Sequence, residues 1–180
     1  MTMTPRLRKV ALTAHVTSTV GWLGAVIVFL ALAVIGLTSQ DAQTVRGAYL
    51  VVEPAAWFVL VPLAFASLLT GIVQSLGTTW GLFRHYWVLF KLLITVVATL
   101  VLLIYMETFS YMAAVAADPN ADLDVVRNTS PRFHAVLALL VLLVAMVLAV
   151  FKPRGMTRYG RRKQDEQWRK QREQRTVPMS

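Results

Sequence analysis

The stretch FHAVLALLVLLVAMVLAVF, residues 133–151, decides the fold of this chain. Apart from His134 it holds only Ala, Val, Leu, Met and Phe, and it is long enough to cross roughly 30 Å of hydrocarbon as a helix. A barrel strand needs only about 10 residues of alternating polarity, and this stretch does not alternate. Because every backbone amide in lipid must be paired within its own segment, the stretch predicts a transmembrane helix.

Three further blocks have the same character: Val10 to Leu37, Tyr49 to Leu76, and Trp87 to Met106. The 180 residues are 57% hydrophobic and 15% charged, whereas charged residues make up about a quarter of a soluble domain. We therefore predict an all-α fold, an integral membrane up-down four-helix bundle with helices near 10–37, 49–76, 87–110 and 133–151. Residues 1–9 would form a basic N-terminus, residues 10–153 the transmembrane domain and residues 154–180 a basic tail. The first block exceeds the roughly 7 to 15 apolar residues of a signal core, so we expect it to be retained.

The basic charge lies at the two ends of the chain. Of a net charge of +9, +3 precedes the first helix and +7 lies between Lys152 and Arg175, which leaves −1 for the residues between. The connection after the third helix is acidic, with Asp118, Asp122 and Asp124. The positive-inside rule therefore predicts that both termini are cytoplasmic. We expect the tail to attract anionic lipid headgroups and not nucleic acid, since no base-reading motif accompanies the charge.

The helices carry an inner layer of polar residues. His15 and Lys91 each lie within about 10 Å of the cytoplasmic end of their helix, and Gln74 reaches the same depth from the antiparallel second helix. His85 lies just beneath them. Intramembrane charges are unfavourable by about 2.5 to 3.5 kcal/mol at the centre on insertion scales, so this layer is a candidate functional site. The chain has no cysteine, which excludes thiolate metal sites and iron–sulfur clusters, and we predict no metal centre.

Two interpretations of the inner layer stay open. In the first, the long stem of Lys91 reaches the cytoplasmic headgroups, and His15 is a neutral imidazole bonded to a nearby hydroxyl or carbonyl. In the second, His15 and Lys91 face each other inside the bundle. An imidazole can ligate a haem iron, and a lysine can pair with a porphyrin propionate. His15 with His85 would be an alternative two-histidine haem site.

An outer layer holds Glu53, Glu107 and His134. The simpler interpretation is that all three are interfacial side chains that reach water. The functional interpretation is that they serve a proton pathway together with the inner layer. The helix at residues 133–151 is otherwise uniformly apolar, so we expect it to pack at the periphery and to contribute least to any site.

Two resemblances add to this picture. The stretch LLTGIVQSLGTTWGLFRHYWVLFK, residues 68–91, together with residues 15–24 and the exit at residues 152–155, is similar to an uncharacterised bacterial family of four-helix membrane proteins. The resemblance covers most of residues 10–160. That family has no established activity, so the resemblance implies a multi-pass protein of the bacterial plasma membrane and no more.

The second resemblance rests on fewer residues. His15 followed by Trp22-Leu23-Gly24, with Trp87 before Lys91, resembles the membrane-bound, oxygen-independent protoporphyrinogen oxidases and the copper-resistance D-type membrane proteins. It implies that His15 and Lys91 handle haem or porphyrin, with haem b as the cofactor. Much of the remaining oxidase pattern is missing, and the tail differs.

Three functions follow from these observations. The first is a non-enzymatic membrane protein, such as a subunit, scaffold or small-molecule conduit in a homo-oligomer or larger assembly. The second is a haem or porphyrin protein centred on His15 and Lys91. The third is a small proton-coupled transporter that uses Glu53, Glu107 and His134, although the helix pairs show no inverted repeat. We expect the first, and therefore do not expect an enzyme.

Overall fold

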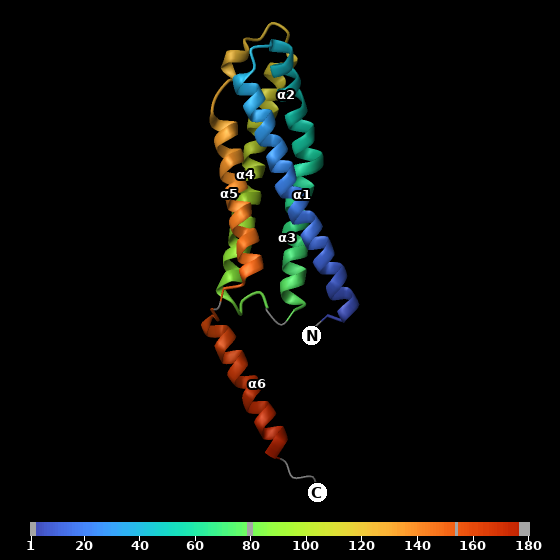
Figure 1. The fold of residues 1–180 in the computed structure, drawn as a ribbon, viewed down its shortest axis with the longest axis vertical. Coiled ribbons are helices and arrows are strands. Elements are labelled where there is room, and N and C mark those ends of the chain that lie inside the picture. The colour runs from blue at the N-terminus through green and yellow to red at the C-terminus, as the bar shows by residue number, and fades with distance from the viewer. Residues whose placement is uncertain (1–2, 79–80, 154, 177–180) are drawn as a thin grey trace.

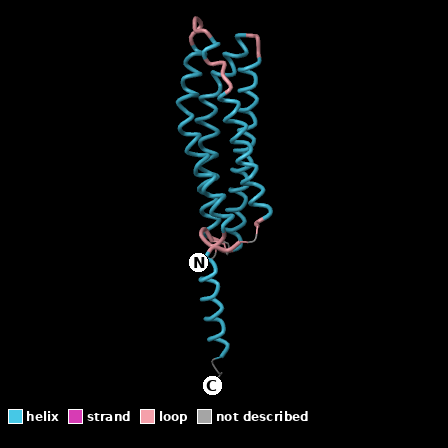
Figure 2. The backbone as a smooth tube through the Cα atoms, turned by 90° about the vertical axis from the view of Figure 1, so that its left-hand side faces the viewer, coloured by secondary structure: helices cyan, strands magenta, loops and turns pink. Residues whose placement is uncertain are grey.

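The structure, a computed structural model, describes residues 3–78, 81–153 and 155–176, with side chains described to residue 173. Long antiparallel helices form an up-down bundle, and a further helix projects from one end (Figures 1 and 2). Four segments are long and apolar enough to cross a membrane: residues 5–38, 42–76, 86–117 and 123–151. The all-α four-helix bundle is therefore confirmed, and it has the composition of a multi-pass membrane protein.

The bundle is built from α1 (Pro5–Thr38), α2 (Ala42–Ala55), α3 (Val61–Leu76), α4 (Tyr86–Ala117) and α5 (Ser130–Phe151). Helices α2 and α3 belong to one continuous span, joined by the π-helical turn η1 (Ala56–Leu60). We call the end that holds Pro5, Leu76, Tyr86 and Phe151 the tail end. The opposite end, with residues 39–41 and 118–129, is called the cap end.

The π-helical turn lies directly before the Val61-Pro62 step that opens α3. The Val61 amide donates to the Ala56 carbonyl, five residues back. Proline lacks the N–H of a helical residue, and its ring would clash with the carbonyl four residues earlier. A wider turn immediately before Pro62 relieves both problems without ending the helix.

All four apolar segments form longer helices than the sequence predicts, and α1 begins at Pro5, so it includes most of the predicted N-terminal segment 1–9. The second span starts at Ala42 rather than residue 49, because Asp41 caps it with hydrogen bonds from Gln43 N (3.4 Å) and Thr44 N (3.0 Å). Helix α4 continues to Ala117, seven residues past the predicted end at 110. Hydropathy alone marks the lipid-spanning portion of a helix, so polar first turns and extensions beyond the bilayer are missed.

Arginine side chains close the cap end. Arg46 Nη1 donates to the Ala116 carbonyl at 3.1 Å, and Arg46 Nη2 donates to the carbonyls of Pro119 (3.1 Å) and Ala121 (3.0 Å). The Arg46 guanidinium thus satisfies carbonyls at the C-terminus of α4, where a helix leaves them without internal partners and carries partial negative charge. The planar fork of an arginine suits several acceptors at once.

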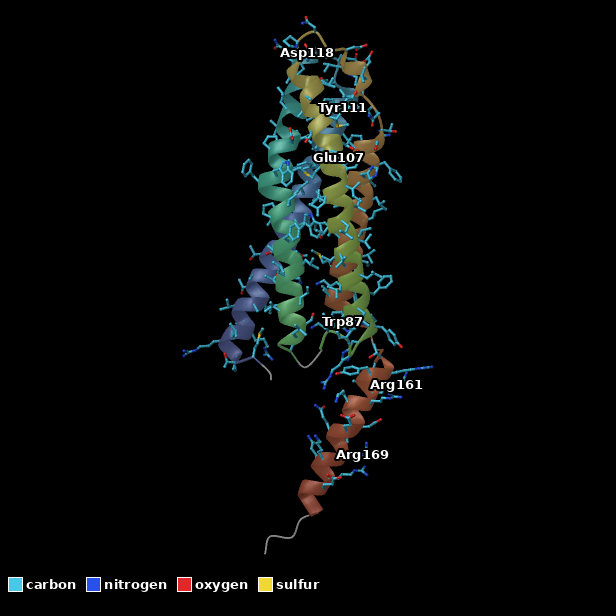
Figure 3. The ribbon with its side chains drawn as sticks, turned by 180° about the vertical axis from the view of Figure 1, so that it is seen from behind. Trp87, Glu107, Tyr111, Asp118, Arg161 and Arg169 are labelled. Carbon is cyan, nitrogen blue, oxygen red and sulfur yellow. The ribbon has the colours of Figure 1, made fainter. Side chains whose placement is uncertain are left out.

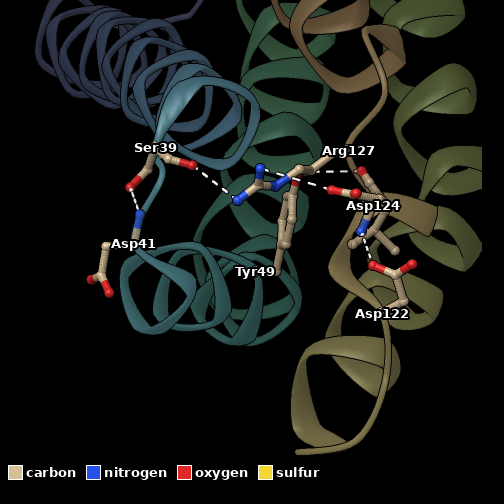
Figure 4. Close-up of polar contacts among 7 residues, drawn as sticks. Ser39, Asp41, Tyr49, Asp122, Asp124 and Arg127 are labelled. Carbon is tan, nitrogen blue, oxygen red and sulfur yellow. Dashed lines mark hydrogen bonds and ion pairs between the residues drawn. The ribbon is translucent and has the colours of Figure 1, made fainter.

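A second network ties the loops together (Figure 4). Arg127 Nη2 donates to the Ser39 carbonyl at 2.9 Å, and Arg127 lies 3.8 Å from Asp124. The buried Tyr49 hydroxyl donates to the Val126 carbonyl at 3.2 Å. Connections 39–41 and 118–129 are therefore held against each other rather than moving separately.

The helix α6 (Arg158–Thr176) projects beyond the tail end (Figure 1). Its start is fixed to the α3–α4 connection, because Thr157 N donates to the Arg84 carbonyl (2.9 Å) and Thr157 Oγ1 to the Phe83 carbonyl (2.6 Å). A Cβ at Gly160 would overlap the Arg84 carbonyl oxygen, so only glycine allows this approach. Thr79, Trp80 and Arg154, which belong to the stretches that carry the first resemblance, lie outside the described residues.

Candidate functional site

His15 and Lys91 meet inside the bundle near the tail end. Lys91 Nζ on α4 lies 2.9 Å from His15 Nε2 on α1. The His15 residue is only 9% exposed. Of the two interpretations that the sequence leaves open for Lys91, the structure has the one in which the lysine turns inward to the histidine.

The second ring nitrogen of His15 is bonded to the third helix of the site. His15 Nδ1 lies 3.1 Å from Thr70 Oγ1 on α3, and the Thr70 hydroxyl lies 2.5 Å from the Ala66 carbonyl oxygen. A carbonyl only accepts, so the single hydroxyl proton of Thr70 is committed to Ala66. Nδ1 must therefore carry a proton and donate to Thr70. In the neutral imidazole Nε2 then holds a lone pair, and Lys91 is the donor.

Small residues make room for this chain of hydrogen bonds. A Cβ at Gly71 would lie 3.1 Å from His15 Cε1, so the imidazole packs directly on the α3 backbone. One turn further along α1, the Thr19 hydroxyl lies 3.1 Å from Ser67 Oγ and donates to the His15 carbonyl at 2.8 Å. Helices α1 and α3 are thus joined by two successive polar contacts next to Lys91.

Among the described residues the His15–Lys91 centre has no acidic partner. Within the described part of the chain, no carboxylate forms an ion pair with Lys91. The side-chain oxygen of Gln74, one turn beyond Thr70, is buried and has no hydrogen-bond partner among the described residues. The structure leaves Gln74 outside the chain from Lys91 to Thr70, and it adds Thr70, which the sequence reasoning missed. The i, i+4 spacing of Ala66, Thr70 and Gln74 is the signal that could have found it.

His85 does not belong to this centre. It is the residue before α4, and its backbone forms an isolated antiparallel bridge with Met156. Both ring nitrogens of His15 already bond to Thr70 and Lys91. Trp87, two residues after His85, lies at the tail end of α4 (Figure 3).

The three residues of the outer layer, Glu53, Glu107 and His134, lie in different surroundings. Glu53 on α2 accepts a hydrogen bond from Ser110 Oγ on α4 at 2.5 Å. Glu107 is exposed, one turn from Tyr111 in the half of the bundle nearer the cap end (Figure 3). His134 lies with Tyr105 instead. In the described ranges no three His, Asp or Glu side chains gather as a metal site would require.

His134 is held at the start of α5 by its neighbours. Its Nδ1 lies 2.9 Å from the Ser130 carbonyl oxygen, and its ring packs against Tyr105 with centroids 4.5 Å apart. The Tyr105 hydroxyl in turn lies 3.1 Å from Ser130 Oγ. The orientation of the imidazole is therefore fixed by a hydrogen bond at its edge and by the Tyr105 ring against its face.

An apolar cavity of about 380 Å³ lies between α1, the second span, α4 and α5, and His134 lines it beside Tyr105. Trp22, Phe29 and Phe109 form its inner wall, and Val97 and Val101, which are exposed on the outside of α4, form its edge. Helix α5 supplies residues from Pro131 to Leu142. The sequence reasoning did not predict this contribution of α5 to the lining. A uniformly apolar helix is well suited to wall an apolar cavity, a role that a search for polar residues overlooks.

Haem does not fit the residues proposed for it. A haem iron needs an imidazole nitrogen with a lone pair directed at the metal, yet Lys91 lies 2.9 Å from Nε2 and Nδ1 bonds to Thr70. The cavity lining includes neither His15 nor Lys91. Along α4 that lining runs from Phe90 to Met112, about 33 Å at 1.5 Å per residue, so the cavity is elongated along the bundle.

Comparison with protein-family models, with curated proteins and with solved structures gave no match.

Proposed function

We propose that this chain is a non-enzymatic, multi-pass protein of the bacterial plasma membrane that binds an apolar molecule inside its bundle. The observation that carries the proposal is the cavity of about 380 Å³ between α1, the second span, α4 and α5. Small-molecule sites in proteins span about 300 to 1,000 Å³, are mostly apolar and carry few polar groups.

The cavity has a route of entry from lipid. Val97 and Val101 line it and are 49% and 45% exposed on the outside of the bundle. An apolar molecule dissolved in the bilayer therefore meets the cavity edge without crossing water. This favours a binding or conduit role within the membrane over a role that draws its ligand from solution.

The proposal is tested by photolabelling in liposomes with a long-chain alkane that carries a diazirine at its middle. Trp22 lines the cavity and is 3% exposed, whereas Trp57 does not line it and is 51% exposed. We expect saturable labelling at Trp22 and unsaturable labelling at Trp57. Labelling of Trp57 alone would refute the proposal.

A matched pair of variants separates cavity filling from general overpacking. Ala138 on α5 lines the cavity, and Ala149 does not. The two positions are 11 residues apart and so lie within about 20° of each other around the helix. Ala138→Phe should suppress Trp22 labelling, and Ala149→Phe should leave it unchanged.

The orientation that goes with this proposal places both termini in the cytoplasm. It is supported by the +3 and +7 charges at the two ends of the chain and by the acidic connection at the cap end. The basic α6 would then meet anionic headgroups near its anchored start. A cysteine introduced as Asp165→Cys should be labelled only by reagents that reach the cytoplasm.

The haem and transporter alternatives make different predictions. A Soret band in the purified protein that His15→Ala abolishes would restore the haem hypothesis. Proton flux in proteoliposomes that falls in Glu53→Gln would restore the transporter. The division of Glu53, Glu107 and His134 among separate environments favours neither.

A further inference from the structure

One ring nitrogen of His134, which lines the cavity, has no hydrogen-bond partner among the described residues. Its Nδ1 lies 2.9 Å from the Ser130 carbonyl oxygen, and a carbonyl only accepts, so Nδ1 carries a proton. In the neutral imidazole the lone pair therefore sits on Nε2. No described residue hydrogen-bonds to Nε2. The Nε2 edge of the ring is turned away from the Ser130 carbonyl, and His134 lines the cavity.

The two tyrosine hydroxyls of the lining have partners in the protein. The Tyr49 hydroxyl donates to the Val126 carbonyl at 3.2 Å. The Tyr105 hydroxyl lies 3.1 Å from Ser130 Oγ. Apart from the indole N–H of Trp22, which is a donor, the remaining walls are aliphatic or aromatic. Beside Tyr105 a ligand therefore meets His134 Nε2, an acceptor to which no described residue donates.

The position of His134 in the lining sets which end of a ligand it meets. It lies four residues into α5, about 6 Å from the start of the helix at 1.5 Å per residue, and it packs against Tyr105 of α4. From Tyr105 the apolar lining continues along α4 to Phe90, about 22 Å toward the tail end. A ligand whose polar group meets His134 can therefore place a hydrocarbon tail along these apolar walls.

We propose that the ligand is a long-chain alcohol, a hydrocarbon chain ending in a hydroxyl, whose O–H donates to His134 Nε2 while the chain fills the cavity. This inference rests on the proposed function and adds the chemical class of its ligand. A chain ending in an ether oxygen offers only an acceptor and would leave Nε2 unpaired. The protein should therefore prefer the alcohol over its own methyl ether.

The test compares two probes that differ in one group: a mid-chain diazirine alcohol about as long as the lining from Tyr105 to Phe90, and its methyl ether. Labelling of Trp22 is divided by labelling of Trp57 in the same sample, which corrects for how much of each probe enters the bilayer. A neutral hydrogen bond corresponds to a preference of about twofold to tenfold. We expect about fivefold in favour of the alcohol in the wild-type protein. In His134→Phe, which keeps a ring against Tyr105, we expect a ratio near one with ether labelling retained.

Tyr105→Phe is the matched control, because it removes the hydroxyl beside His134 and keeps the ring. It should retain the alcohol preference. Loss of the preference in Tyr105→Phe but not in His134→Phe would overturn the proposal, as would equal labelling by both probes in the wild-type protein.

A wild-type measurement covers the case in which His134→Phe does not fold. Donation from the alcohol should shift the ¹⁵N resonance of His134 Nε2, and the ether should leave it in place. An unshifted resonance at saturating alcohol would refute the hydroxyl contact. Absence of Trp22 labelling by either probe would instead refute the proposed function itself.

Discussion

The contact between His15 and Lys91 predicts a strong energetic coupling between two positions on different helices. His15→Leu removes a hydrogen bond to a charged group, worth about 1.5 to 3 kcal/mol, and a neutral one, worth about 0.5 to 1.5 kcal/mol. The variant should therefore be about 2 to 4 kcal/mol less stable, since Lys91 and Thr70 both lose a partner at a buried site.

Lys91→Met should change stability little. Removing the cation relieves an intramembrane penalty of up to about 2.5 to 3.5 kcal/mol, and leaving His15 Nε2 without a donor forfeits about 1 to 3 kcal/mol. The double variant His15→Leu/Lys91→Met has no buried ammonium that lacks a hydrogen-bond partner. The double variant should therefore be more stable than His15→Leu alone by at least about 1.5 kcal/mol.

The assay is reversible unfolding in mixed micelles followed by far-UV circular dichroism. Thr17→Leu, on the exposed face of α1, controls for placing a leucine in this helix. Single-variant effects that add to the double within about 0.5 kcal/mol would show that the two side chains do not interact. That result would return Lys91 to the headgroup region, the simpler interpretation of the sequence.

Three further predictions concern the cap end. Arg46→Lys should lower the free energy of unfolding by about 1 to 3 kcal/mol, since an ammonium cannot serve all the carbonyls that the guanidinium reaches; the same titration measures it. The hydrogen bond from the Thr44 side chain lowers the pKa of Asp41, so its contribution is present above the unfolded pKa and is lost as the pH falls through the folded value. Helicity followed in acid should fall less in Asp41→Asn than in the wild type. Gly36→Ala should destabilise the protein by about 1 to 3 kcal/mol, because its Cβ would lie 2.6 Å from the Tyr49 ring; an unchanged midpoint would contradict the packing seen here.

The sequence predicted the bundle because one strong physical effect determines it. Long apolar blocks have no alternative to helices in lipid, and the block at residues 133–151 leaves little else to decide. The helix ends were less predictable, since Asp41 starts α2 by local hydrogen bonds and Arg46 supports the end of α4 from far away in sequence. Hydropathy contains neither kind of information.

For the candidate site, only the depth of its residues along the helices was predictable from the sequence. Counting residues placed His15, Lys91 and Gln74 in one layer, and two of them meet. Whether side chains at one depth touch depends on the rotation of each helix about its own axis, which packing of many apolar side chains decides. The same uncertainty explains the outer layer, where Glu53 turns to Ser110 and His134 to Tyr105.

The His15–Lys91 centre and the cavity impose one orientation on a bound chain. Both features lie on the buried stripe of α1, where Trp22 follows His15 by two turns. A carboxylate head would be attracted to the uncompensated Lys91, but the cavity lining passes from Phe90 to Leu93 without including it. An acid therefore gains no contact at the tail end, and beside Tyr105 its oxygens meet the lone pair of His134 Nε2. In the Trp22 labelling assay a diazirine fatty acid should thus compete less well than the matching alcohol. A fatty acid that labels Trp22 better than the alcohol, and loses that advantage in Lys91→Met, would mean that the chain binds in the reverse orientation, with its head at the tail end.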